Sequence, residues 1–293
     1  MMLNKKYISR LLLLPGVVFV LISSSPVVSA KETIAMVTDL TGKASITTDG
    51  DKKACEILMS LYAGDEINVV EGSKLTIVYF NSAKEYIFSG NTLISVKSEG
   101  PKNNRGSKAE TRELAIIKDS VLLPSGENYS QAAIVLRGER KKPKIKLIYP
   151  VNSKVIDPRP TFEWLPIEKV IQYRFILTDE SGRTVIETLA NGNSFKLPVE
   201  NNIEEGVLYS WQVEARLSTG AVYSNSTSFS LIDEDELEKI NRLRPKDKAT
   251  YSERVVFAIL LEQMGVRDEA YDYWKALASE RPDNELLKAK AKE

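Results

Sequence analysis

Alternating apolar and polar residues mark the stretch from Leu147 to Ile232. In its clearest run, Tyr209–Leu217, apolar residues take every second position and polar residues lie between them. Because alternate residues of a strand point to opposite faces of a sheet, this run predicts a half-buried β-strand. Similar alternation surrounds Phe162 and Phe175. About seven such runs, with turn residues about every 8 to 12 positions, predict a β-sandwich over residues 147–232.

Four aromatic residues of this stretch are candidates for the sandwich core. Aromatic side chains at inward strand positions bury a large apolar area, so we expect a core role, with a ligand platform as the alternative. The four residues are Trp164, Tyr173, Tyr209 and Trp211.

A second β-rich region precedes the sandwich, at residues 31–136. Short β-type runs between Ile34 and Lys97 are separated by glycines, which is typical of a small all-β domain. The best expected strands are Lys43–Thr48, Glu66–Val70, Lys74–Phe80, Lys84–Phe88 and Thr92–Val96.

The end of this region is less regular. Pro101–Arg112 is polar and is interpreted as a loop. We expect a strand pair at Leu114–Leu123 and a further strand at Ala132–Leu136. Residues 137–146 then form a basic linker that leads to the sandwich.

The linker concentrates basic side chains. One interpretation is a solvated connection between domains. The other is a patch for an anionic polymer or lipid head group, to which each basic residue adds roughly 1 kcal/mol. No aromatic residue lies among the charges, so single-stranded nucleic acid is not an expected ligand. The candidate interaction residues are Arg137, Arg140, Lys141, Lys142 and Lys144.

Residues 233–293 have a helical pattern. Four acidic residues precede Leu237–Leu243, and acids are favourable at the partly positive N-terminus of a helix. A second helix is expected to start near Thr250, where Glu253 completes a capping box, and to stop at Gly265. A third is expected from about Asp268 to Glu280.

The first thirty residues have the pattern of a secretory signal peptide. Basic residues up to Arg10 precede an apolar run, Leu11–Ile22, and small residues end at Ala30. The apolar run is shorter than the roughly 20 residues that span a bilayer. We therefore expect export with cleavage after Ala30, with a retained anchor as the alternative and no integral membrane span after cleavage.

The amino-acid composition limits the catalytic and metal sites that the chain can form. The 293 residues include 40 basic and 40 acidic side chains, one cysteine and no histidine. Without the first thirty residues the balance becomes acidic, which disfavours nucleic acid as the partner. The lack of histidine removes histidine-based triads and most transition-metal sites. Adjacent carboxylates such as Asp65 and Glu66 point to opposite faces of a strand and cannot flank one bond. We expect no enzyme activity, no cofactor and no metal.

Three segments resemble known families. The order "LTGKASI", "LYAGDEINVVEGSKLTIVYF" and "SGNTLISV" resembles the FecR-type periplasmic β-domain, some members of which relay a signal to a sigma factor. The segments "IYPVNSKVIDPRPTFEW" and "GVLYSWQVEARLSTGAVYSNSTSFSL" resemble a fibronectin type III or immunoglobulin-like domain. The segment "RVVFAILLEQMGVRDEAYDYWKALASERPDN" resembles a tetratricopeptide repeat, with Trp274 at the large aromatic position.

One repeat unit does not bury its apolar faces by itself. We therefore expect the helices to pack on Leu237–Leu243, on the sandwich or on another protein, and we take Trp274 as a candidate interaction residue.

These observations predict a multidomain, mainly β chain. It consists of a small all-β domain, an immunoglobulin-like β-sandwich that acts as a spacer, and an α-helical hairpin tail. The expected function is a non-catalytic protein-interaction or scaffold module in the periplasm or extracellular cell envelope of a bacterium, with other envelope proteins as partners. The alternatives are a polysaccharide- or peptidoglycan-binding protein and an envelope signalling regulator of the FecR type.

Overall fold

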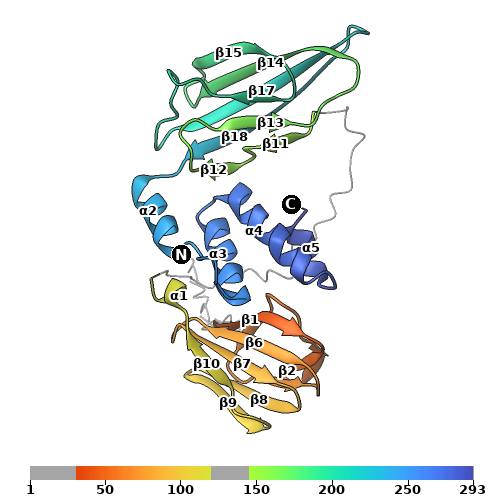
Figure 1. The fold of residues 1–293 in the computed structure, drawn as a ribbon, viewed down its shortest axis with the longest axis vertical. Helices are drawn as coiled ribbons and strands as arrows, with labels where there is room; N and C mark the ends of the chain where they lie inside the picture. The colour runs from red at the N-terminus through yellow and green to blue at the C-terminus, as the bar shows by residue number, and fades with distance from the viewer. Residues whose placement is uncertain (1–30, 120–144, 293) are drawn as a thin grey trace, which may run out of the picture. The chain divides into compact units, whose positions relative to one another are not determined.

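The computed structural model describes residues 31–119 and 145–292. This part of the chain is mainly β, with several antiparallel sheets and a C-terminal group of helices (Figure 1). The predicted fold class is therefore confirmed.

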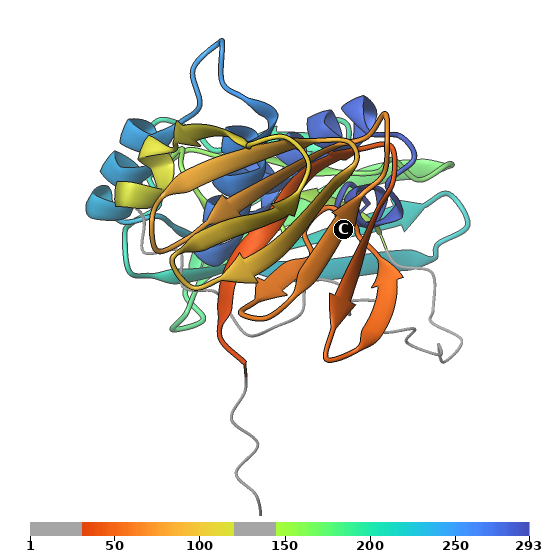
Figure 2. The same cartoon turned by 90° about the horizontal axis from the view of Figure 1, so that it is seen from below.

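The N-terminal β-domain consists of two five-stranded antiparallel sheets, which Figure 2 shows from below. The first sheet has the order β10-β7-β6-β1-β4, formed by β1 (Thr33–Thr41), β4 (Ser60–Tyr62), β6 (Lys74–Tyr79), β7 (Lys84–Ser89) and β10 (Glu110–Glu113). The second has the order β3-β2-β5-β8-β9, formed by β2 (Ala44–Thr48), β3 (Asp51–Ala54), β5 (Glu66–Val69), β8 (Thr92–Lys97) and β9 (Gly100–Arg105). Leu75, Ile77 and Tyr79 of β6 are fully buried in the core of this domain.

The five predicted strands of this domain are present as β2, β5, β6, β7 and β8. The loop prediction for Pro101–Arg112 is wrong, because β9 and β10 occupy most of that stretch. Both are edge strands with largely exposed side chains, so they lack the apolar alternation that would have identified them.

The strand pair predicted at Leu114–Leu123 is also wrong where the structure describes it. Ala115–Asp119 is a short helix, α1, whose Ile116 and Ile117 are buried against other helices. Tertiary packing here overrides the β preference of a β-branched run. The remainder of that stretch and the strand predicted at Ala132–Leu136 lie outside the described residues.

The middle β-domain packs a three-stranded sheet and a five-stranded sheet around one core. The smaller sheet has the order β11-β13-β16, formed by β11 (Leu147–Tyr149), β13 (Thr161–Trp164) and β16 (Ser194–Lys196). The larger has the order β12-β18-β17-β14-β15, formed by β12 (Ser153–Val155), β14 (Val170–Asp179), β15 (Thr184–Ala190), β17 (Leu208–Leu217) and β18 (Val222–Leu231). The best predicted strand, Tyr209–Leu217, is β17.

The helical group consists of α2 (Glu234–Leu243), α3 (Tyr251–Gln263), α4 (Arg267–Glu280) and α5 (Glu285–Lys290). The predicted capping box at the start of α3 is present, because the Glu253 amide donates to Thr250 Oγ1 at 3.2 Å and the Thr250 amide donates to Glu253 Oε2 at 2.6 Å. The prediction missed α5, a short helix capped by the Asn284 side chain.

The helical group shares its apolar core with the N-terminal β-domain. Met36 of β1 and Val78 of β6 belong to the same buried cluster as Phe257 of α3 and Leu277 of α4. The outer face of the β1–β6 pair is therefore covered by helices, and β6 is buried on both faces. This domain was not among the packing partners expected for the helices.

Candidate interaction site

The four aromatic residues assigned to the sandwich core are all buried. The exposed fraction is 0% for Trp164 and Trp211, 7% for Tyr173 and 4% for Tyr209. Three of their polar atoms bond within the domain: Trp211 Nε1 donates to the Pro150 carbonyl at 2.8 Å, and the hydroxyls of Tyr173 and Tyr209 accept from backbone amides. These side chains consequently form no surface platform for a ligand.

The candidate interaction residues of the linker, Arg137, Arg140, Lys141, Lys142 and Lys144, lie outside the described residues.

Trp274 lies inside the helical group, which corrects its prediction as an interaction residue. It is 1% exposed, and its Nε1 donates to Glu262 Oε1 at 2.9 Å. Lys290 Nζ lies 5.9 Å from the ring centroid. The three helices α3, α4 and α5 thus use Trp274 to pack on one another, and none of its apolar surface is available to a partner.

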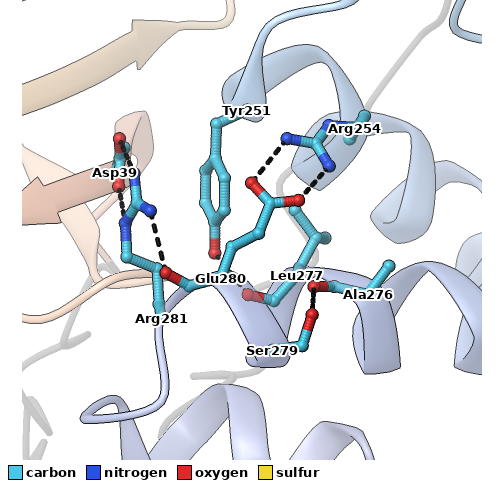
Figure 3. A network of polar contacts seen from close by, with 8 residues as sticks. All are labelled: Asp39, Tyr251, Arg254, Ala276, Leu277, Ser279, Glu280 and Arg281. Atoms are coloured by element: carbon cyan, nitrogen blue, oxygen red, sulfur yellow. Dashed lines mark hydrogen bonds and ion pairs between the residues drawn. The ribbon is translucent and has the colours of Figure 1, made fainter. Parts of the chain in front are cut away.

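A polar cluster attaches the helices to the N-terminal β-domain (Figure 3). Arg281, at the end of α4, donates from Nε and Nη2 to the two carboxylate oxygens of Asp39 on β1, each at 2.8 Å. Its guanidinium carbon lies 4.5 Å from the ring centroid of Tyr251. Deeper in the interface, the hydroxyls of Thr38 and Ser252 lie 2.8 Å apart and are buried. The cluster therefore joins the first strand of the chain to both helices of the hairpin.

The cluster also supports the hairpin itself. The guanidinium of Arg254 on α3 forms two hydrogen bonds with the carboxylate of Glu280 on α4. The Tyr251 hydroxyl donates to the Leu277 carbonyl at 3.2 Å (Figure 3). Burial raises the pKa of Tyr251 above its ordinary value, so this phenol remains a donor at neutral pH.

A second set of contacts attaches the helices to the middle β-domain. The residue before α4 is Val266, whose side chain makes no capping hydrogen bond. Instead, Ser153 of β12 places its hydroxyl oxygen 3.0 Å from the Arg267 amide and 3.3 Å from the Asp268 amide, and it accepts from both. The first amides of a helix need such acceptors. The middle domain thus supplies the cap that the helix lacks in its own sequence.

Neighbouring contacts reinforce this joint. The Lys154 amide donates to the Gly265 carbonyl at 2.8 Å, and the Lys154 ammonium pairs with Glu236 of α2. Asp268 Oδ2 accepts from the Val151 amide at 3.4 Å. Burial raises the pKa of the Asp268 carboxyl to about 6. The attachment therefore includes a carboxyl group that titrates within the range of ordinary buffers.

The outer face of the five-stranded middle sheet carries exposed aliphatic side chains. Leu189, Leu208 and Val222 are 55%, 52% and 54% exposed. Strand register places them on the face opposite to the core residues with which they alternate. Arg174 of β14, directly opposite Leu189, pairs with Glu187 of β15 and Glu214 of β17 on the same face. Among the described residues, seven of the eight large exposed hydrophobic side chains belong to this domain: Ile148, Leu165, Ile171, Leu189, Val199, Leu208 and Val222.

The second sheet of the N-terminal β-domain has a polar face. Strand register places Lys52, Thr47, Glu66, Ser95 and Lys102 in one row across the sheet, and Ser45, Asn68, Leu93 and Arg105 in the next row. Arg105 Nη2 donates to Asn68 Oδ1 at 3.2 Å. This face carries the cations of Lys52, Lys102 and Arg105 together with the Glu66 carboxylate, hydroxyl groups and an amide, while Ser95 within it is only 8% exposed.

The chemistry-bearing residues named in the sequence have structural roles. Asp65 is 1% exposed, and its Oδ2 accepts a hydrogen bond from the Tyr62 amide at 2.8 Å. The Asp65 side chain therefore stabilises the turn that follows Tyr62. Burial raises the pKa of the Cys55 thiol to about 12. In residues 31–119 and 145–292, no group of three or more histidine, cysteine or acidic side chains is placed to hold a metal ion. No helix in the same part of the chain is long and apolar enough to cross a membrane.

Two attachment residues were missed in the sequence. Ser153 and Arg281 act across long separations, on amides 114 and 115 residues away and on a carboxylate 242 residues away. One signal was available for Ser153: Val266 precedes α4 where a capping side chain is usual, so an outside acceptor was needed.

No family model and no curated protein matches the chain. Among solved structures, CopC from Methylosinus trichosporium OB3b is similar over 30% of this chain and 92% of its own, at 14% identity and a TM-score of 0.24. A segment of two fibronectin type III domains from chicken tenascin covers 68% of this chain and 94% of its own, at 15% identity and a TM-score of 0.20. A β-1,2-glucanase from Parabacteroides distasonis covers 86% of this chain and 49% of its own, at 10% identity and a TM-score of 0.22. Likenesses this distant place the chain in no family and carry no functional argument.

Proposed function

We propose that this chain is an exported, non-catalytic protein of a bacterial cell envelope that acts as a protein-interaction scaffold. The observation that carries the proposal is the double attachment of the helical group. Arg281 and Ser252 contact the N-terminal β-domain, while Asp268 and the first amides of α4 contact the middle β-domain. Because these contacts hold the modules in place, little conformational entropy is lost when a partner binds to their outer surfaces. A low entropic cost of binding favours a scaffold role.

The surface proposed for the partner protein is the outer face of the middle sheet. Aliphatic side chains exposed by more than half, such as Leu189 and Val222, lose contact with water when a partner covers them. Arg174, held by two carboxylates, supplies a fixed polar centre. Protein interfaces combine apolar contacts with arginine and exclude most other charges from their centre.

Export rests on the N-terminal pattern of residues 1–30 and on the resemblance of residues 31–136 to the FecR-type periplasmic domain. A chain with one cysteine forms no internal disulfide, which suits a bacterial envelope better than a eukaryotic secreted setting. The relay to a sigma factor known in some FecR-type proteins is not part of this proposal.

The proposal is tested by affinity capture from bacterial envelope extract on the immobilised chain, residues 31–293. The variant Leu189→Asp/Val222→Asp places two charges on the outer face. The matched control, Val70→Asp, alters a side chain in the N-terminal domain that is 44% exposed. We expect the same captured proteins with wild type and control, and their loss with the double variant. Equal capture by all three refutes the assignment of this face.

A second candidate function is binding to cell-wall polysaccharide, which the polar face of the N-terminal β-domain favours. Lys52, Lys102 and Arg105 stand among hydroxyl and amide groups on one sheet surface. Cations and hydrogen-bonding groups in this arrangement suit an anionic sugar polymer.

Co-sedimentation with purified cell wall tests this candidate. We expect wild-type chain to pellet at low salt, and Lys102→Glu/Arg105→Glu to remain in solution. The control Lys275→Glu alters an exposed lysine of α4 and should pellet like wild type. Wild-type chain that stays in solution at low salt removes this candidate.

A further inference from the structure

The joint between α4 and the middle β-domain contains a half-buried carboxylate without a cation partner. Within the part of the chain that the structure describes, Asp268 forms no ion pair, and its Oδ2 accepts only a long hydrogen bond of 3.4 Å from the Val151 amide. The Ser153 hydroxyl beside it, which accepts from the Arg267 and Asp268 amides, donates to the Lys154 carbonyl at 3.0 Å. Removing a carboxylate from water without a matching cation costs free energy.

The groups around this carboxyl add no compensating charge. Lys154 of β12 is already paired with Glu236, and Arg244 is paired with Glu269. The titratable and charged groups at the joint are Tyr149 of β11, Lys154 of β12, Glu236 of α2, and Arg267, Glu269 and Asp272 of α4, of which Arg267 is exposed. Asp157 and Glu163 also act on Tyr149. Asp272, one turn along α4, repels the Asp268 carboxylate.

We propose that this joint is strengthened by acid: proton uptake by Asp268 tightens the attachment of the helical group to the middle β-domain. Protonation removes the charge that burial disfavours. A carbonyl oxygen of the neutral carboxyl still accepts from the Val151 amide. The positive end of the α4 dipole favours the charged form, but only by about 0.3 to 1 kcal/mol at such a site. Desolvation is the larger effect, because the joint removes much of the carboxylate from water and supplies no cation in its place.

The direction and the magnitude of the pH effect follow from the difference between the Asp268 pKa in the closed joint and in the open joint. The carboxyl has a pKa of about 6 in the closed joint and about 3.9 when the joint is open and the side chain is solvated. A group whose pKa is raised on closing stabilises the closed joint. This stabilisation is fully present below about pH 4 and is lost as the pH rises through about 6. These values make the closing constant about tenfold larger at pH 5 than at pH 7.

Hydrogen exchange on the full chain, followed by NMR, tests the proposal. The amides of Arg267 and Asp268 report directly on the joint, because both donate to Ser153. Protection factors, corrected for the intrinsic exchange rate at each pH, should be about tenfold higher at pH 5 than at pH 7. The amides of β17 serve as an internal reference for global stability.

Three variants separate this mechanism from a general effect of pH. Asp268→Asn should abolish the pH dependence and keep the high protection found in acid. Asp272→Asn, an exposed neighbour, should retain most of the dependence. Ser153→Ala should lower protection at both pH values and leave their ratio unchanged. The proposal is overturned if Asp268→Asn keeps the wild-type pH dependence, or if acid lowers wild-type protection at these amides relative to β17.

Discussion

Replacing Arg281 by alanine tests the attachment between the helices and the N-terminal β-domain. The change removes two hydrogen bonds of 2.8 Å to Asp39 and a guanidinium placed 4.5 Å from the Tyr251 ring centroid. The side chains of Arg281 and Asp39 are only 29% and 19% exposed. Alanine therefore leaves a largely buried carboxylate without its cation.

The expected cost exceeds that of an ordinary surface pair. Hydrogen bonds to charged groups contribute about 1.5 to 3 kcal/mol, and a cation over an aromatic ring adds about 0.5 to 2 kcal/mol. Allowing for partial solvent screening, we expect Arg281→Ala to lower the local free energy of opening by about 2 to 4 kcal/mol.

Native-state hydrogen exchange of the amides in α3 and α4 measures this free energy. A double-mutant cycle with Asp39→Ala isolates the pair from the other losses, and we expect a coupling of about 1 to 3 kcal/mol. The pair Glu285–Lys288 is the matched control, because its side chains are 83% and 39% exposed. Its cycle should give about 0.5 kcal/mol or less.

Two results contradict this reasoning. One is a coupling between Asp39 and Arg281 no larger than that of the control pair. The other is an Arg281→Ala variant whose helices keep the wild-type protection. Either would mean that the apolar core around Met36 and Val78 holds the helices without help from the polar cluster.

Three further predictions concern single residues. Thr250→Ala removes the α3 cap and should cost about 1 kcal/mol, read from the protection of the first α3 amides, while Thr250→Ser should be nearly neutral. Trp211→Phe keeps a ring in the sandwich but leaves the Pro150 carbonyl without its donor; it should lower the free energy of opening of β17 by about 1 to 3 kcal/mol, against about 3 to 5 kcal/mol for Trp211→Ala. Cys55, buried and with a pKa of about 12, should resist thiol reagents at mildly alkaline pH and react at a rate set by unfolding; rapid labelling of the native chain contradicts its burial.

Elements with a strong local signal could be predicted from the sequence. Buried and more exposed residues alternate along most of strand β17, and the capping box of Thr250 and Glu253 indicates the start of α3. Elements without such a signal were missed. Strand β9 is polar because it forms an edge, and α1 owes its helical form to the burial of Ile116 and Ile117 among residues distant in sequence.

The attachment sites could not be predicted, because their contacts join residues that are 82 to 242 positions apart. One local pattern did contain the information. The run "LTIVYF" at residues 75–80 is apolar almost without interruption, which is typical of a strand buried on both faces. Alternation alone assigns Leu75, Ile77 and Tyr79 to a core face and gives Val78 no partner, whereas the structure packs Val78 against the helical group.

The helical group is attached differently to the two β-domains. The core cluster of the middle β-domain draws on strands and loops of that domain, and within the described part of the chain it includes no residue of α2–α5. The outer face of β1 and β6, in contrast, has Met36 and Val78 in one cluster with α3 and α4. The N-terminal β-domain therefore shares one apolar core with the helices. The middle domain contacts them through hydrogen bonds of Ser153 and Asp268, through the Lys154–Glu236 ion pair, and through Ile156 and Ile232, which pack in the helical cluster. Because the core of the middle domain is separate from that of the helices, loosening this joint would uncover Ile156 and Ile232 but leave Trp164 and Trp211 buried. We therefore expect any change in the geometry of the scaffold at this joint rather than at the interface with the N-terminal domain.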